Sequence, residues 1–340
     1  MEHLKPFTIS ELKTILKKRP KETKFGEHIL LLSNFTNIYE QLIKLDVTYV
    51  IFGIKEDVGV FANYGKTGTC NAWDAAIKVL LNTQSNAHTH PKKVLVLGHL
   101  EFPELQNEIK NLSQSKKKHI IAARKKVEII DQSVSFLVSQ IVQAGKIPIV
   151  IGGGHNNAYG IIKGTSLALK KPINTINFDA HHDFRAEEGR HSGNGFSYAF
   201  AEGFLKNYFI FGLHENYTSD QIFKTLKKLK AIQYSTFESI MVRQDTNFNS
   251  EMDMALNHIS SKRFGIEIDC DAIQNIPSSA MTPSGFSVNQ ARQFVNYFAH
   301  HENAIYLHIC EAAPTPDTET QVGKLITNLI TDFIRAREHI

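Results

Sequence analysis

The stretch Asn177-Phe178-Asp179-Ala180-His181-His182-Asp183-Phe184-Arg185 begins at the end of an apolar, β-branched run, residues 173–178. Three possible metal ligands, Asp179, His181 and Asp183, occupy alternate positions in it. If the apolar run is a strand, alternate residues share one face, so the three side chains can leave its carboxyl end toward one point. Oxygen and imidazole ligands together suit Mn, Fe, Co or Zn better than a thiol-preferring metal. Asp and His also populate ordinary turns, so this stretch alone leaves both interpretations open.

Apolar runs typical of strands alternate with helical patterns on both sides of this stretch. Strands are predicted at 47–54, 94–98, 147–151, 173–178, 208–212, 264–268 and 304–309. Helices are predicted at 72–81, 119–144, 156–169, 197–205, 219–229, 250–260, 288–300 and 319–337. The more polar segments 55–68 and 102–118 are expected to be loops, the second with a broken helix. This alternation predicts βαβ units and hence an α/β fold, with three layers (α/β/α) and a mainly parallel central sheet.

The first 45 residues read as a helical extension before this pattern. Ser10 can cap a helix that runs through Leu16 and ends at Pro20, and a second helical stretch spans 37–45. No repeat and no linker divides the remainder. We therefore expect an N-terminal extension over 1–45 and a single domain over 46–340.

Composition limits the classes of partner. A chain of 340 residues can bury a substantial core, and its formal charge of +4 gives no reason to expect a nucleic-acid partner. The N-terminus lacks the apolar core of a signal peptide, and no window approaches the roughly 20 apolar residues of a membrane span. Three scattered cysteines are too few for a disulfide framework. A reduced, cytoplasmic setting without a membrane partner is expected.

Ionisable residues follow other predicted strands as well, where ligands bind in open parallel sheets. Gly152-Gly153-Gly154-His155 follows 147–151, Asp269-Cys270-Asp271 follows 264–268, and Cys310-Glu311 follows 304–309. The glycines could form a phosphate-binding turn, but the Lys-Ser/Thr of the Walker pattern is missing. Two aspartates one residue apart could form a turn, yet they repel unless a cation lies between them. A glutamate at an apolar strand end is costly unless it is paired or faces a site.

Together these strand ends supply more ligands than one metal needs. The candidate ligands are His155, Asp179, His181, Asp183, Asp269 and Asp271. Two divalent ions that share carboxylates fit this set better, and such pairs activate a bridging water. A binuclear metal site is the prediction.

The three motifs resemble those of the ureohydrolase superfamily of arginases, agmatinases and formimidoylglutamases, over about residue 47 to the C-terminus. The family's Gly-Gly-x-His motif matches 152–155, its Asp-Ala-His-x-Asp motif matches 179–183, and its Asp-x-Asp motif matches 269–271. The resemblance implies an arginase-like fold and two Mn²⁺ ions, although the ligand types also admit other divalent metals. It implies that His155, Asp179, Asp183 and Asp269 hold one ion, and that Asp179, His181, Asp269 and Asp271 hold the other.

The resemblance also implies residues of the substrate pocket. Glu311 matches the glutamate that grips the amidine or guanidine group. Ser192 and Asn194 match substrate-binding positions, and Asn63 with Gly65 resembles a loop that closes the pocket.

Three positions favour formimidoylglutamases over arginases. Arginases carry a proton-relaying histidine where this chain has Phe196, and asparagine where it has Arg185. Arginases and agmatinases usually carry aspartate where it has Gly154. A guanidinium can grip a substrate carboxylate with two hydrogen bonds, which suits a dicarboxylate substrate. The alternative for Arg185 is a surface ion pair with Glu187 or Glu188.

The expected activity is therefore hydrolysis of N-formimidoyl-L-glutamate to L-glutamate and formamide, in histidine catabolism. A metal-bridging hydroxide would attack the amidine carbon held against Glu311, and Asp183 or solvent would return a proton. One alternative is a guanidino-compound hydrolase that releases urea. Another is a catalytically idle metal-binding protein on the same fold, which need not retain all six ligands. The resemblance also implies that the chain forms a homo-oligomer and that its substrate is a small amidine or guanidino molecule.

Overall fold

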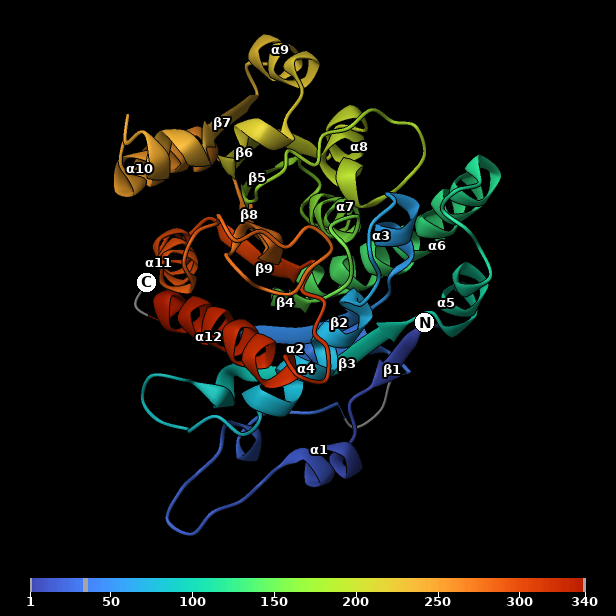
Figure 1. Ribbon diagram of the computed structural model, residues 1–340. Helices are drawn as coiled ribbons and strands as arrows, with labels where there is room; N and C mark the ends of the chain where they lie inside the picture. Colours follow the sequence, from blue (N-terminus) through green and yellow to red (C-terminus); the bar gives the residue numbers. More distant parts are fainter. Residues whose placement is uncertain (1, 33–35, 339–340) are drawn as a thin grey trace.

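The computed structural model describes residues 2–32 and 36–338, and Figure 1 shows its arrangement. Within these residues nine strands form one sheet in the order β1-β3-β2-β4-β9-β8-β5-β6-β7. Every neighbouring pair is parallel except β1 and β3, which are antiparallel. The strands are β1 (Leu4–Pro6), β2 (Tyr49–Lys55), β3 (Val94–Glu101), β4 (Ile147–Ile151), β5 (Ile173–Phe178), β6 (Leu205–Leu213), β7 (Ile232–Thr236), β8 (Phe264–Asp269) and β9 (Ala304–Cys310).

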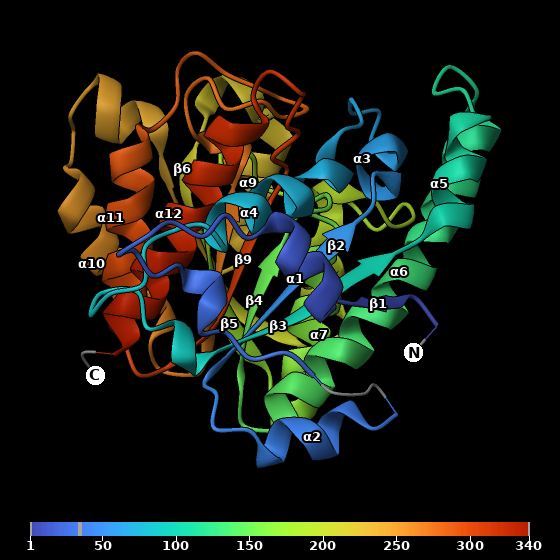
Figure 2. The same ribbon diagram turned by 90° about the horizontal axis from the view of Figure 1, so that it is seen from below.

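Helices cover both faces of the sheet. They are α1 (Ile9–Ile15), α2 (Ile38–Lys44), α3 (Val58–Ala62), α4 (Ala72–Leu80), α5 (Pro103–Lys110), α6 (Lys117–Gln143), α7 (Asn157–Leu169), α8 (Gly195–Ala201), α9 (Asp220–Lys228), α10 (Phe248–Ile259), α11 (Val288–Ala299) and α12 (Glu319–Arg337). Figure 2 shows α10, α11 and α12 on one side of the strands and α6 and α7 on the other. The predicted three-layer α/β/α fold is confirmed.

Two hydrophobic cores fill the spaces between the layers. Along β4, Ile149 and Ile151 belong to the core beneath α4, α11 and α12, whereas Val150 belongs to the core beneath α6 and α7. Alternate residues of a strand point to opposite faces, so a strand buried on both sides needs an unbroken apolar run. This is why β4 and β5 coincide with the predicted runs at 147–151 and 173–178.

Two segments predicted to be loops contain helices. The segment 55–68 holds α3, whose five residues are all buried. The segment 102–118 holds α5, an unbroken helix of eight residues that begins at Pro103. Proline suits the first turn of a helix because its missing N–H has no helical partner there. α3 forms from a short apolar stretch, Val58–Ala62, inside an otherwise polar segment.

The two outermost strands, β1 and β7, were not predicted. β1 has only three residues, and it lies close enough to β3 that a Cβ at Gly98 would be 2.1 Å from the carbonyl oxygen of Lys5. β7 alternates buried and more exposed residues. β1 is too short, and β7 too mixed in its burial, to produce an apolar run in the sequence.

The N-terminal segment contributes to the sheet through β1. Thr8, and not the predicted Ser10, caps α1, because its side chain accepts from the Glu11 N–H in a reciprocal capping box. Asn37 caps α2. The predicted units 1–45 and 46–340 include residues 1, 33–35, 339 and 340, which lie outside the described residues, and we retain this division as a proposal. None of the described helices is long and apolar enough to cross a membrane.

Candidate metal centre

Four adjacent strands in the middle of the sheet bring the sequence motifs together. β4, β9, β8 and β5 are neighbours in that order and all run parallel. Their carboxyl ends therefore meet at one edge. His155 follows β4, Glu311 follows β9, Asp269 ends β8 and Asp179 follows β5.

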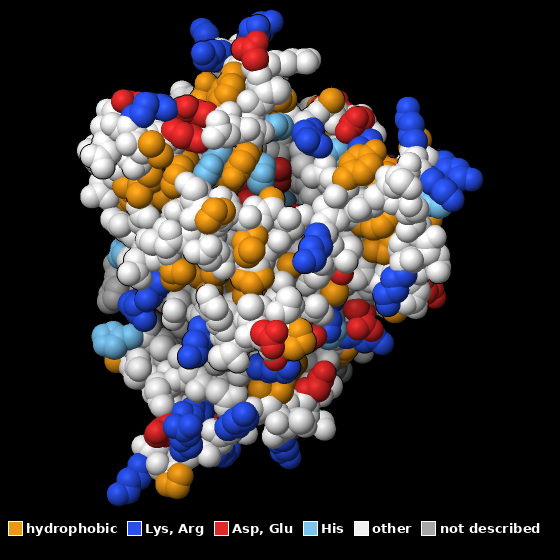
Figure 3. Space-filling model, viewed as in Figure 1, with side chains coloured by type: hydrophobic (Ala, Val, Ile, Leu, Met, Phe, Trp, Pro, Cys, Tyr) orange, Lys and Arg blue, Asp and Glu red, His pale blue; other side chains and the backbone are white. Residues whose placement is uncertain are grey.

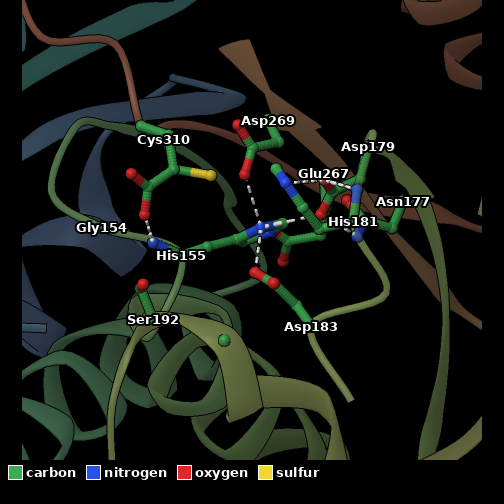
Figure 4. Close-up of polar contacts among 12 residues, drawn as sticks. Gly154, His155, Asn177, Asp179, His181, Asp183, Ser192, Glu267, Asp269 and Cys310 are labelled. Atoms are coloured by element: carbon green, nitrogen blue, oxygen red, sulfur yellow. Dashed lines mark hydrogen bonds and ion pairs between the residues drawn. The ribbon is translucent and has the colours of Figure 1, made fainter. Parts of the chain in front are cut away.

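The first group of candidate ligands surrounds the ring of His155 (Figure 4). Its Nδ1 lies 2.9 Å from Asp183 Oδ2, 3.1 Å from Asp269 Oδ2 and 3.3 Å from Asp179 Oδ2. One ligand atom from each of the four residues lies within 4.8 Å of the others. The four residues predicted to hold one ion are thus brought together.

The second group shares Asp179 with the first. His181 Nδ1 lies 3.6 Å from Asp179 Oδ1 and 3.3 Å from Asp271 Oδ2. One ligand atom from each of these three residues lies within 4.8 Å of the others. Asp269 adjoins this group through its Oδ1, which accepts the Asp271 N–H at 2.9 Å. All six predicted ligands therefore lie in one cluster, with Asp179 common to both groups.

The carboxylates in this cluster crowd one another. Burial, and then the charges of Asp271 and Asp179, raise the pKa of Asp269 well above its ordinary value. Burial and then Asp179 also raise the pKa of Asp183. Among the described residues, the buried Oδ1 of Asp271 has no hydrogen-bond partner. Buried carboxylates so arranged repel unless cations lie between them, and oxygen with imidazole suits divalent metals. The donor set therefore fits two divalent cations.

Two residues of the site have strained backbones. Asp183 and Glu311 have φ of 42° and 60°, in the left-handed region that residues with a Cβ rarely adopt. Such conformations cost about 1–3 kcal/mol each and persist only where the surroundings enforce them. Strain of this kind clusters at functional sites.

Glu311 is held against the turn that carries His155. Its N–H donates to the Gly153 carbonyl at 3.1 Å, and its Oε1 accepts the His155 N–H at 2.8 Å. Burial, and then Asp271 and Asp183, raise its pKa to about 8. Gly154 is needed at this turn because a Cβ there would lie 2.6 Å from Asn156 Oδ1 and 3.2 Å from Glu311 Oε1.

A cavity of about 290 Å³ opens above the cluster, and Figure 3 shows it as a hollow containing His and acidic side chains. Its lining residues are Asn63, Tyr64, Gly65, His181, His182, Asp183, Arg185, Ser192, Gly193, Tyr217, Asp269, Asp271, Ser279, Ala280 and Glu311. The predicted pocket residues Asn63, Ser192 and Arg185 are therefore in contact with the same cavity as Glu311.

Asn63 joins Arg185 and Ser192 into one side of the cavity, which we call the distal wall. Arg185 Nη1 donates to Asn63 Oδ1 at 3.0 Å, and Asn63 Nδ2 donates to Ser192 Oγ at 3.1 Å. In the described part of the chain, no ion pair joins Arg185 to Glu187 or Glu188. Glu188 instead pairs with Arg124 at 3.0 Å. The surface-pair alternative for Arg185 is therefore not what the structure contains.

Asn194 does not line the cavity. Its Oδ1 accepts from Arg190 Nη1 at 2.6 Å and from the His191 N–H at 3.0 Å, and its Nδ2 donates to the Gly189 carbonyl at 2.9 Å. Arg190 is itself buried and donates to Asp131 at 2.9 Å. The Asn194 side chain thus supports the turn that presents Ser192, beneath the distal wall.

Sequence reasoning missed several residues around the site. Tyr217 stacks on the ring of the candidate ligand His181, with centroids 5.6 Å apart, and Ser279 lines the cavity from a distant loop. Loop residues like these carry no periodic signal. Glu267 did carry a sequence signal, because it interrupts the apolar strand β8 two residues before Asp269. Phe196, at the arginase relay position, packs edge-on against His155 at 5.1 Å.

Comparisons with known proteins show which family and which folds this chain resembles. Residues 48–335 match the model of the arginase family. The formimidoylglutamase of Streptococcus gordonii is 26% identical over 297 residues, which cover 84% of this chain and 83% of that protein. The crystal structure of Bacillus subtilis formimidoylglutamase aligns with a TM-score of 0.74 at 17% identity, over 95% of this chain and 94% of that one. Trypanosoma cruzi formiminoglutamase with Mn²⁺ aligns with a TM-score of 0.70 at 16% identity, over 92% of this chain and 99% of that one.

Proposed function

The chain belongs to the arginase family, and we propose from this premise that it hydrolyses N-formimidoyl-L-glutamate to L-glutamate and formamide, a step of histidine catabolism. It is a hydrolase of C–N bonds in linear amidines, and the formimidoylglutamases among its relatives support this choice of substrate. The observation that carries the proposal is one cavity with acidic ligands on its floor and Arg185 on its distal wall.

The floor would hold two Mn²⁺ ions. His155, Asp179, Asp183 and Asp269 would bind one, and Asp179, His181, Asp269 and Asp271 the other, in keeping with the two groups of donor atoms. When bound, two such cations lower the pKa of water and stabilise negative charge that develops in a transition state. Other divalent metals have the same preference for these ligands.

Glu311 would orient the reacting group. One of its oxygens is occupied by the His155 N–H, so the other is available to accept from the formimino nitrogen. A charge-assisted hydrogen bond of this kind fixes the amidine carbon above the carboxylate cluster. Asp183 borders the cavity as well, and its carboxylate would take a proton from the attacking water and return it to the departing amine nitrogen.

The distal wall would select the acid end of the substrate. Arg185 offers a planar guanidinium that matches a carboxylate, and Asn63 keeps it beside the cavity. The Ser192 hydroxyl adds a further polar contact within the same wall. Asn194, as an indirect support, would act through the turn that carries Ser192.

A guanidino-compound hydrolase that releases urea is the second candidate. Glu311 favours it to the same degree as the first, because a guanidinium presents the same N–H groups to a carboxylate as an amidinium does. Arginine and agmatine differ from the first candidate at the distal wall, where their free amine would meet Arg185 unfavourably.

A substrate panel tests the proposal. Purified protein is reconstituted with Mn²⁺, and release of formamide, urea and ammonia is measured from formimidoylglutamate, arginine, agmatine and guanidinoacetate. We expect the highest kcat/KM for formamide release from formimidoylglutamate. A higher kcat/KM for urea release from any guanidino compound would replace the proposed substrate. No turnover with metal demonstrably bound would favour an idle metal-binding protein.

A further inference from the structure

The two ring nitrogens of His155 have different surroundings. Nδ1 faces the carboxylates of Asp179, Asp183 and Asp269. Nε2 is buried on the opposite side, and in the described part of the chain it has no hydrogen bond. A neutral imidazole that binds a cation through Nδ1 carries its hydrogen on Nε2. A buried N–H without an acceptor costs about 1–3 kcal/mol, so an acceptor is needed there.

Glu267 is placed to be that acceptor. Its Oε2 lies 3.5 Å from His155 Nε2, and both side chains are labelled in Figure 4. Glu267 lies on β8 two residues before Asp269, so both side chains leave the same face of the strand. It is fully buried in a strand whose alternate face is apolar. A buried carboxylate is costly unless hydrogen-bond donors surround it.

The neighbouring strand β9 supplies two such donors. The Tyr306 hydroxyl donates to Glu267 Oε1 at 2.7 Å, and His308 Nδ1 contacts Oε2 at 2.6 Å. An ionised carboxylate only accepts hydrogen bonds, so His308 Nδ1 is the donor. Both residues are fully buried. These two hydrogen bonds therefore hold Glu267 from one side, with its Oε2 directed toward His155.

A glycine leaves space for the Tyr306 ring beside Glu267. Gly265 pairs with Tyr306 across the two strands, and a Cβ at Gly265 would lie 1.9 Å from Cζ of the tyrosine ring. Glycine inside a strand weakens it and marks a site of close approach. Here that approach lets the tyrosine hydroxyl reach Glu267. The arrangement spans two strands and positions one carboxylate.

We propose that Glu267 is a positioning residue that accepts the Nε2 hydrogen of His155 and so directs Nδ1 toward the metal. This inference rests on the proposed metal centre. Ligating histidines are commonly oriented in this way, and loss of such a partner typically weakens metal binding about 10- to 100-fold. Glu267 would thus act on the ion that His155 holds and have less effect on the ion at His181 and Asp271.

Metal titration of the full chain tests the inference. Wild type, Glu267→Gln and the control Glu251→Gln are stripped of metal and titrated with Co²⁺, with calorimetry and visible absorption as readouts. Glu251 is a matched control because it is also a buried glutamate, but on α10. We expect wild type and control to bind two equivalents alike. In Glu267→Gln one equivalent should bind about 10- to 100-fold more weakly.

Each other outcome has a definite meaning. Equal affinities in wild type and Glu267→Gln would overturn the inference alone, whereas a wild type that binds no Co²⁺ would overturn the metal centre and the inference together. A third equivalent that Cys310→Ser removes would assign Nε2 to a group with His308 and Cys310, and so also overturn it. If Glu267→Gln does not fold, Tyr306→Phe replaces it. In Tyr306→Phe, one equivalent of Co²⁺ should bind more weakly than in wild type, by a smaller factor than expected for Glu267→Gln. Unchanged Co²⁺ affinity in Tyr306→Phe would overturn the inference.

Discussion

The floor and the distal wall of the cavity are built in different ways. The floor consists of side chains at the ends of four adjacent strands, and His155 and Asp179 within it are fully buried. The distal wall comes from loops, and its Arg185 is exposed to solvent. Strand ends in a packed sheet hold side chains rigidly, whereas loops can vary without disturbing the sheet. Under the proposed function, the floor would carry the chemistry common to the family, and the wall would decide which substrate enters.

Substitution of a floor residue should affect every substrate alike. Asp179→Asn removes the carboxylate shared by both ligand groups. Metal catalysis is worth several kcal/mol, so kcat/KM should fall by about 10³-fold or more for each substrate in the panel. Metal content measured by atomic absorption should fall in parallel. A variant that keeps both ions and loses activity toward one substrate only would contradict the expectation that floor residues affect all substrates alike.

The buried support of the wall should matter more for stability than for chemistry. Arg190→Ala leaves the buried Asp131 without its partner, which should lower the free energy of unfolding by about 3–5 kcal/mol. Burial already raises the pKa of Asp131 to about 6, and removal of Arg190 raises it further. The folded state of the variant then binds the proton more tightly than the unfolded state does. The contribution of Asp131 to stability is therefore fully present only below its unfolded-state pKa of about 4 and falls as the pH rises, so the variant should be more stable at pH 5 than at pH 8.

Urea unfolding at both pH values measures this loss. Arg124→Ala is the matched control, because Arg124 ties the same loop to α6 through Glu188, whose side chain is 52% exposed. Only Glu188 of this pair is exposed, and the Arg124 side chain is 11% exposed, so we expect a loss of about 1 kcal/mol, smaller than that for the fully buried Arg190 pair. Equal losses in the two variants would show that burial of the Arg190 pair has no special importance for the wall.

Loss of the wall cation should discriminate among substrates. Arg185→Ala removes charge-assisted hydrogen bonds worth about 1.5–3 kcal/mol, so kcat/KM for formimidoylglutamate should fall about 10- to 100-fold, mainly through KM. Formamidine, which has no carboxylate, should be affected little. Steady-state kinetics with both substrates gives the ratio, and Arg263→Ala is the control, because Arg263 is an exposed arginine just before the amino end of β8. Equal losses for both substrates would remove Arg185 from the substrate site.

The smallest effect is expected at the residue that links the wall together. Asn63→Ala removes one hydrogen bond to Arg185 and one to Ser192. A neutral hydrogen bond contributes about 0.5–1.5 kcal/mol, so KM for formimidoylglutamate should rise about 2- to 10-fold with kcat preserved. The double variant Asn63→Ala/Arg185→Ala should be no worse than Arg185→Ala if Asn63 acts through Arg185. Additive losses of kcat/KM in the double variant would instead indicate that Asn63 contacts the substrate directly.

Much of the fold could be predicted from apolar periodicity. The central strands β4 and β5 are apolar throughout because both of their faces are buried, and their limits matched the prediction. The edges carried less information. β1 has three residues and depends on Gly98 of a distant strand, and α3 is helical because the packing around it buries every residue. These elements take their structure from neighbours that lie far away in the sequence.

The candidate site could be predicted to a similar depth. The six candidate ligands could be identified because each follows an apolar run and falls in a short motif. Asn194 belongs to the same motif as Ser192, yet its side chain turns away into hydrogen bonds with Arg190 and Gly189. Tyr217 and Ser279 approach from loops without any local pattern. A motif identifies which backbone is near a site, but it does not determine the direction of each side chain.

The sequence by itself determined the class of fold, the types of candidate ligand and their place at strand ends, because these depend on local periodicity and short spacings. Only the tertiary structure decided that β4, β9, β8 and β5 are neighbours, since strand order depends on crossovers between segments far apart in the chain. The same order places Glu267 beside His155 and Asn63 beside Arg185. Ligand identity is thus a local property of this chain, whereas the orientation of those ligands depends on long-range packing.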